Sequence, residues 1–231
     1  MNVRRIIGSL VATTLAATSL TLVATTSPAA AATKVTIISG TSSKPWLYPS
    51  YKSQPGAPTY GDSLSVSINV TAPGTQTVYA GTVSVQRRLA GQSWKTILRS
   101  QDAYLYKTIK AAGNASYRVI YSGGSNYQGT FAPAVSSIKS LKTQRKLTTT
   151  TLSGRHAGFK GKVSPAKKVK IVVFKKKHGK YKKYKSLRAN RKGKFTVILP
   201  APRSGRYNWK IVFKGDAKFA PSTIKGWTRR T

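Results

Sequence analysis

The chain has 231 residues, of which 41 are Lys or Arg and only three are acidic, so its formal net charge is +38. It contains no cysteine, which excludes disulfide bonds and thiolate metal sites. A chain with this imbalance repels itself and attracts polyanions, so we expect an anionic partner.

The first 32 residues have the layout of a cleavable secretory signal peptide. Arg4 and Arg5 give a positive start, an apolar stretch runs from Ile6 to about Val23, and small residues occupy positions 29–32. Charged, apolar and small-residue regions in this order are typical of such signals. An uncleaved membrane anchor is the alternative, but the Ser and Thr content and the Ala-rich end favour cleavage. We therefore expect a secreted chain that is associated with the cell surface or cell wall.

No later apolar run approaches the roughly 20 residues that span a bilayer, so no membrane span is expected after cleavage. The segment that follows the leader carries Trp46, Tyr48 and Tyr51 among prolines, outside any strand-like alternation. Because loops often carry function, these three residues form a candidate exposed aromatic site for a ligand.

Alternation with a period of two predicts β-strands through the rest of the chain. Apolar residues alternate with Ser or Asn in residues 64–70, and aromatic or branched residues alternate with polar ones in 117–121 and 209–213. Turns rich in Gly and Pro separate these segments, and none shows helical periodicity with a cap. Many short strands in units of about 90 residues predict β-sandwiches. The large side chains expected in their cores are Trp94, Tyr117, Tyr121, Tyr127 and Trp209.

A repeat divides the mature chain into two related units. Residues 117–127 recur as residues 209–219 at an offset of 92, and upstream segments recur at 88 to 91. The charge changes at the same boundary: residues 1–140 hold 13 basic and two acidic side chains, whereas 141–231 hold 28 and one. We expect domain 1 over residues 33–140, a polar linker over 141–147, and a strongly basic domain 2 over 148–231.

Three motifs resemble those of bacterial immunoglobulin-like domains. Tyr60-Gly61-Asp62 resembles the turn that leads into an early strand, and residues 121–127 and 213–219 are similar to a late Tyr-x-Gly-Asp-x-x-Tyr signature. The first copy has Gly124 instead of Asp, and the second has Phe at both aromatic positions. Nearly all of the mature chain is similar to Ig-like repeats of exported actinobacterial proteins. This resemblance implies two tandem Ig-like β-sandwiches that serve as adhesive, spacer or wall-associated modules.

The small number of acids and histidines argues against an enzyme. The only candidates are Asp62, Asp102, Asp216, His156 and His178. Glycoside hydrolysis needs two carboxylates that flank one bond, and a hydrolytic triad needs a base with an orienting acid. We expect no catalytic residue, no metal and no cofactor. The acids of the two Gly-Asp turns are expected to bond to nearby backbone amides.

A basic tract at residues 175–194 is the strongest functional signal. Eleven of its twenty residues are Lys or Arg, and His178-Gly179 between two arms predicts a hairpin. A solvated protein surface normally mixes charges of both signs, whereas domain 2 has a single acid. The predicted polyanion-binding residues are Lys175, Lys176, Lys177, Lys180, Lys182, Lys183, Lys185, Arg188, Arg191, Lys192 and Lys194.

Lysine predominates over arginine in this tract, and ammonium groups act as point charges without the bidentate fork of a guanidinium. We therefore expect contact driven by charge. Anionic envelope polymers such as teichoic acid or acidic glycans are the first hypothesis for the partner. Extracellular nucleic acid is an alternative, and a purely structural spacer or adhesion module is another.

Overall fold

The structure is a computed structural model that describes residues 32–41, 43–152, 157–199 and 206–228. The predicted leader therefore lies almost entirely outside the described residues, as does His156. Every described residue belongs to one compact unit. In the described ranges all regular secondary structure is β-strand, and a search of them finds no helix with the length and hydropathy of a membrane span.

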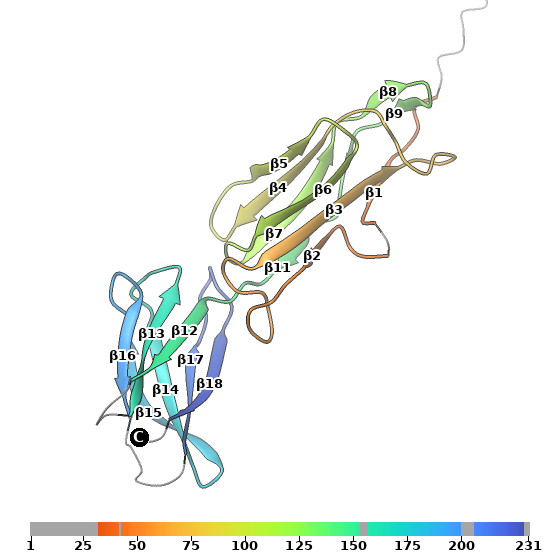
Figure 1. The fold of residues 1–231 in the computed structure, drawn as a ribbon. Helices are drawn as coiled ribbons and strands as arrows, with labels where there is room; N and C mark the ends of the chain where they lie inside the picture. Colours follow the sequence, from red (N-terminus) through yellow and green to blue (C-terminus); the bar gives the residue numbers. More distant parts are fainter. Residues whose placement is uncertain (1–31, 42, 153–156, 200–205, 229–231) are drawn as a thin grey trace, which may run out of the picture. The chain divides into compact units, whose positions relative to one another are not determined.

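The strands are assigned in chain order, and Figure 1 labels most of them. They are β1 (Ile37–Ser39), β2 (Leu47–Pro49), β3 (Ser63–Thr71), β4 (Val83–Leu89), β5 (Lys95–Ser100), β6 (Tyr104–Lys110), β7 (Ala115–Tyr121), β8 (Gly124–Asn126), β9 (Gly129–Phe131), β10 (Ala134–Val135), β11 (Lys139–Leu141), β12 (Lys146–Thr151), β13 (Gly158–Ser164), β14 (Lys170–Lys177), β15 (Lys180–Arg188), β16 (Lys194–Ile198), β17 (Tyr207–Phe213) and β18 (Ser222–Thr228). They form two Ig-like β-sandwiches that follow one another along the chain, which confirms the predicted fold.

The first sandwich packs two antiparallel sheets face to face. In the first sheet, β1 and β2 pair with opposite ends of β3, and β6 pairs with β3 along most of its length. In the second sheet the strand order is β10-β7-β4-β5, and β11 also pairs with β7. The predicted alternation in residues 64–70 places every second side chain of β3 in the core. The largest contributors to this core are Trp46, Leu64, Ile68, Tyr117, Tyr121 and Phe131.

The second sandwich repeats this arrangement. Its sheets have the orders β12-β13-β16 and β15-β14-β17-β18. In the smaller sheet β13 is the central strand, between β12 and β16, and it corresponds to β3 of the first sandwich. In the larger sheet β14 lies between β15 and β17, and it corresponds to β4, which lies between β5 and β7. The equivalent strands β7 and β17 carry the sequence repeat at offset 92, so strand order and sequence agree on the duplication.

Two glycines allow aromatic rings to cover the backbone of a neighbouring strand in the second core. Gly161 is the cross-strand partner of Phe195, and Gly226 is the partner of Trp209. A Cβ at either glycine would overlap the ring opposite. Phe159 then packs on the indole, with 4.4 Å between the ring centroids of Phe159 and Trp209. Glycine is therefore required by packing at these two positions.

The predicted linker over 141–147 is longer than the one observed. Leu141 ends β11 in the first sandwich, and Lys146 already begins β12 in the second. Leu147 pairs with Val163 and is only 2% exposed. A strand was expected to open at residues 148–151, and the polar composition of the run concealed only its first two residues, Lys146 and Leu147.

The connecting residues 142–145 are bonded to the strands and turns around them. The amide of Gln144 donates to the carbonyl of Pro58 at 2.8 Å, and the carbonyl of Thr143 accepts from the amide of Ala220 at 2.8 Å. Thr143 and Arg145 are buried. These residues are therefore an ordered part of the fold.

The aromatic core prediction is confirmed for three residues and wrong for two. Tyr117, Tyr121 and Trp209 are buried in the cores, as their alternation indicated. Tyr127 is 90% exposed because it lies in the β8–β9 turn, beyond the strand that ends at Tyr121. Trp94 is half-buried on the surface, because it belongs to the β4–β5 connection rather than to a strand.

Candidate anion-binding site

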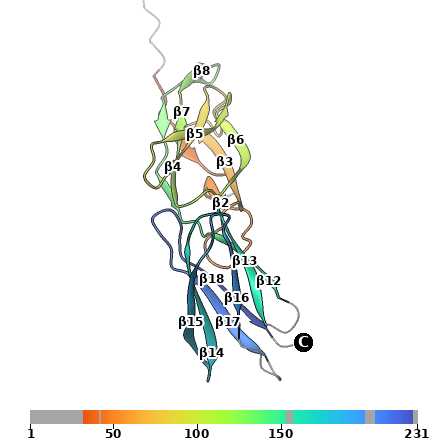
Figure 2. The same cartoon turned by 90° about the vertical axis from the view of Figure 1, so that its left-hand side faces the viewer.

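The basic tract forms a hairpin, as predicted. β14 and β15 are joined by His178 and Gly179, whose φ angles of 48° and 76° suit the two-residue turn of a β-hairpin. Lys177 pairs with Lys180 beside the turn. The described pairing of β14 with β17 ends at Lys175, so the tip is held only by its own two strands, and it projects beyond the rest of its sheet in both views (Figures 1 and 2).

Lysines lie directly opposite one another in this hairpin. Lys175 pairs with Lys182, and Lys177 pairs with Lys180. Like charges directly opposite on antiparallel strands destabilise the pairing. The only ion pair among the described residues lies elsewhere, between Arg145 and Asp216, so no carboxylate neutralises these lysines. A bound polyanion would relieve this repulsion.

Three of the eleven predicted residues do not lie on the hairpin. Arg191 and Lys192 lie in the turn after β15, and Lys194 belongs to β16, where it pairs with Lys162 in the other sheet. These three lie off the hairpin because the chain passes to the opposite sheet after Ala189, and their part in polyanion binding stays a prediction. The other eight lie on β14 and β15.

The structure adds cations that are distant in sequence to the hairpin's sheet. Lys210 on β17 pairs with Phe174 and with Lys225 on β18. Its Nζ lies 4.7 Å from the ring centroid of Phe174 and 4.8 Å from that of Tyr181. The alternation in residues 209–213 is the signal that could have identified Lys210, because it places this side chain on the face opposite the buried Trp209.

A groove of about 460 Å³ lies beside the hairpin, along β14. Its base includes Val172, Phe174 and Phe213, of which Phe174 is half-buried and the other two are buried. Five exposed lysines also line it: Lys167, Lys168, Lys170, Lys183 and Lys214. Only Lys183 among them belongs to the predicted site. Asp216, which pairs with Arg145, also lines the groove. The groove therefore combines an apolar base with a rim of five lysines and one paired carboxylate.

The predicted exposed aromatic site around Trp46 is wrong in its central residue. Trp46 is 3% exposed, because β2 pairs with β3 and draws the adjacent indole into the first core. Tyr48 is half-buried, with Nζ of Lys44 5.2 Å from its ring centroid. Tyr51 is 65% exposed. The three rings do not form a common surface.

The acids of the two Gly-Asp turns accept backbone hydrogen bonds, as predicted. Asp62 is 5% exposed, and its Oδ2 accepts from the amides of Thr59 at 2.8 Å and Ser53 at 3.0 Å. Burial alone would raise the pKa of Asp62, but these hydrogen bonds outweigh it and hold the pKa below its usual value. Asp216 Oδ1 accepts from the amides of Lys218 and Phe219.

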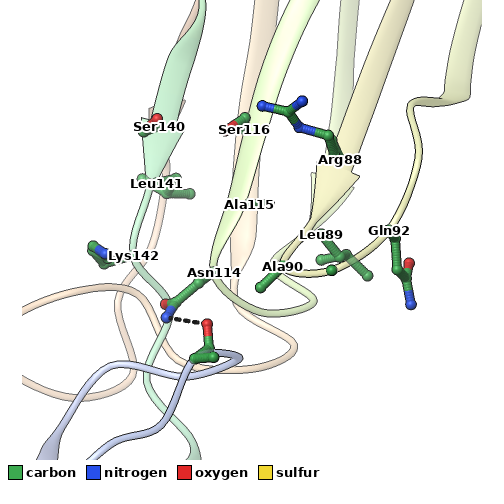
Figure 3. A pocket seen from close by; sticks show the side chains of 12 residues that line it. Arg88, Leu89, Ala90, Gln92, Asn114, Ala115, Ser116, Ser140, Leu141 and Lys142 are labelled. Atoms are coloured by element: carbon green, nitrogen blue, oxygen red, sulfur yellow. Dashed lines mark hydrogen bonds between the residues drawn. The ribbon is translucent and has the colours of Figure 1, made fainter.

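A second groove, of about 510 Å³, is lined mainly by residues of the first sandwich (Figure 3). Arg88, Lys142, Ser116 and Ser140 contribute its polar groups, and the side-chain amide of Asn114 donates to the carbonyl of Ala217 at its edge. Neither a carboxylate nor a histidine lines it. In the described part of the chain, no group of three or more His, Cys, Asp or Glu side chains could hold a metal ion.

No protein-family model matches this chain, and no curated protein matches it significantly. Among solved structures it is similar to one described as "Structural insight into host cell surface retention of a 1.5-MDa bacterial ice-binding adhesin", with 11% identity, a TM-score of 0.28 and 74% of this chain covered. The chain spans 58% of the length of that structure.

A second similar structure is that of the chicken CNTN1 FN1–FN3 domains. The identity is 15%, the TM-score is 0.24, and the match covers 79% of this chain and 68% of the other. At these TM-scores neither neighbour carries information about the function of this chain.

Proposed function

We propose that this chain is a secreted, non-catalytic Ig-like protein of the cell surface or cell wall, which binds anionic polymers through its basic second sandwich. Teichoic acid or an acidic glycan of the envelope is the proposed partner. The proposal includes a relationship to the Ig-like repeats of exported actinobacterial proteins, supported by the Gly-Asp turns and the duplication.

The observation that carries the proposal is the lysine hairpin without acidic partners. Its opposed pairs, Lys175 with Lys182 and Lys177 with Lys180, raise the local positive potential. The one acid of the second sandwich, Asp216, is bonded to Arg145 and to backbone amides. Among the described residues, no carboxylate therefore forms an ion pair with a lysine of the hairpin.

The non-catalytic part of the proposal is supported by the positions of the acids. Asp62 is buried in a turn of the first sandwich, and Asp216 is engaged in a turn of the second. Asp102 is exposed in the short connection between β5 and β6. No two of them flank a common groove, which is what general acid–base chemistry on one substrate would require.

Salt-dependent binding tests this function. Neutralising about six phosphates releases condensed counterions, so affinity for duplex DNA should fall roughly a thousandfold between about 50 and 200 mM salt. The slope of log affinity against log salt concentration should be smaller on a less densely charged teichoic acid than on DNA. The salt dependence on either polymer should become weaker when six hairpin lysines are replaced with Gln: Lys175, Lys176, Lys177, Lys180, Lys182 and Lys183. A matched control replaces six exposed lysines of the first sandwich, Lys44, Lys52, Lys95, Lys107, Lys110 and Lys139, with Gln.

Equal losses in both variants would mean that net charge alone drives binding and that the hairpin is not the site. Tighter binding to DNA than to teichoic acid or acidic glycan at physiological salt would favour the nucleic-acid function. Absence of binding to every polyanion at low salt would leave only a spacer or adhesion role. Release of the protein from cell walls by stepwise salt would test the proposed location.

A further inference from the structure

The groove along β14 differs chemically from the hairpin tip, although both are cationic. At the tip, Lys177 and Lys180 flank the turn and offer charge alone. In the groove, Val172 and Phe174 form part of an apolar base, surrounded by five lysines and by Asp216, whose carboxylate is paired with Arg145. A plain inorganic anion gains nothing from the apolar base, so the groove suits a ligand that has both an anionic group and an apolar face.

Strand alternation explains how this combination arises. Ile171 and Val173 face the core and are fully buried, so Val172 and Phe174 lie on the outer face of the same strand. An outer strand position of an exposed sheet is normally polar. Here Phe174 is only half-buried, and its cross-strand neighbours are Lys183 and Lys210. This departure from the usual pattern marks the position as a contact surface.

Lysines surround the ring of Phe174 on neighbouring strands. Lys183 on β15 and Lys210 on β17 are its cross-strand partners, and Nζ of Lys210 lies 4.7 Å from the ring centroid. Lys167, Lys168 and Lys214 line the groove from the loops at the end of the sheet. An anionic group attached to a molecule lying on Phe174 would therefore be within the field of several ammonium groups.

We propose that this groove binds an anionic sugar unit of a glycopolymer, with the C–H face of the sugar ring on Phe174 and Val172 and its carboxylate or phosphate among the rim lysines. This inference rests on the proposed polyanion-binding function and assigns a ligand class to it. A groove of about 460 Å³ lies within the size range of small-molecule sites and holds one or two ring units. An acyl chain would extend beyond so short an apolar base, and the bases of duplex DNA are not available for stacking.

The test compares two variants of equal net charge in the full chain. One removes three lysines of the groove rim (Lys167, Lys168 and Lys214→Gln), and the other removes three at the hairpin tip (Lys177, Lys180 and Lys182→Gln). All six are exposed, so neither variant should disturb folding. A third variant, Phe174→Leu, keeps an apolar side chain but removes the ring. The probes are oligogalacturonate for carboxylates, a phosphorylated mannan oligosaccharide for sugar phosphates, and inorganic polyphosphate as an anion without a ring.

We expect the rim variant and Phe174→Leu each to weaken binding of at least one sugar probe about tenfold, and the tip variant less than threefold. Polyphosphate should respond to both lysine variants equally and not to Phe174→Leu. Whichever sugar probe responds identifies carboxylate or phosphate as the anionic group. In NMR spectra, the Val172 methyl and Phe174 ring signals should shift with the sugar probe and not with polyphosphate.

If the rim and tip variants lost equal affinity for the sugar probes and Phe174→Leu bound them as tightly as the unmodified protein, the groove would not be the site. The proposed function of general polyanion binding would still stand. Preferential binding of anionic phospholipid vesicles, lost in Phe174→Leu, would overturn the sugar assignment in favour of a lipid. Failure of the unmodified protein to bind any of the probes at low salt would instead refute the proposed function itself.

Discussion

Arg145 and Asp216 form an ion pair, with Nη2 of the guanidinium 3.3 Å from Oδ2 of the carboxylate. The Arg145 side chain is 2% exposed, and that of Asp216 is 38% exposed. The guanidinium also donates to the carbonyl of Pro165 at 3.0 Å and lies 4.1 Å from the ring centroid of Phe219. The single acid of the basic sandwich thus stabilises a buried cation in the connection between the sandwiches, and its exposed part lines the groove along β14.

Asp216→Asn should destabilise the second sandwich by about 1–3 kcal/mol, because it leaves the buried Arg145 charge without its counterion. This is less than the loss expected for a fully buried pair, since water reaches Asp216. Chemical denaturation with hydrogen exchange on peptides of each sandwich measures it. The control is Asp102→Asn, at an exposed site, which should change stability by less than about 0.5 kcal/mol. Equal stability of the two variants would contradict the role assigned to the pair.

Acid should weaken the first sandwich through Asp62. Because the pKa of Asp62 is lower in the folded chain than its ordinary value of 3.8, the folded state binds fewer protons at this site. Its contribution to stability is therefore complete above pH 3.8 and is lost as pH falls through the lowered folded value. Thermal unfolding between about pH 6 and pH 2 measures this. Asp62→Asn should remove this part of the pH dependence, and an unchanged acid profile in that variant would show that other groups cause it.

Gly226→Ala should destabilise the second sandwich by about 1–3 kcal/mol, because its Cβ would overlap the Trp209 indole that covers this position. Fluorescence of Trp209 should also change as the ring is displaced. Lys225→Ala, at the adjacent exposed position of β18, is the matched control and should leave the core unchanged. If the Gly226→Ala variant were as stable as the unmodified protein, the Trp209 indole would not need glycine at position 226 in order to pack, which would contradict this prediction.

Trp46→Ala should destabilise the first sandwich by about 3–5 kcal/mol, as expected for loss of a buried aromatic side chain. Tyr51→Ala should have little effect on stability, because Tyr51 is 65% exposed. Urea denaturation measures both. Neither should alter polyanion binding in the folded protein, since the two residues lie on the first sandwich. A specific loss of binding in Tyr51→Ala would restore the aromatic segment as a ligand site.

Local alternation was sufficient to predict β3, β7 and β17 and the part of the aromatic core that lies within β7 and β17. The sequence around Tyr117 and Trp209 has strict period two, and in a strand this period alone decides which side chains face inward. Tyr127 and Trp94 were mispredicted because they lie in a turn and a connection, where the alternation no longer applies. Trp46 was mispredicted for the opposite reason: the pairing of β2 with β3 is a long-range contact that its local sequence does not encode.

The sequence by itself determined the two-sandwich fold, the duplication, the turns capped by Asp62 and Asp216, and the lysine hairpin, because each depends on neighbours within a few residues or on a constant offset. Only the tertiary structure decided which cations share a face. Pairing of β14 with β17 brought Lys210 beside Phe174, whereas the crossing after Ala189 carried Lys194 to the other sheet. Charge in a sequence is additive, but a binding surface depends on which strands are adjacent, and long-range hydrogen bonding between strands sets that adjacency.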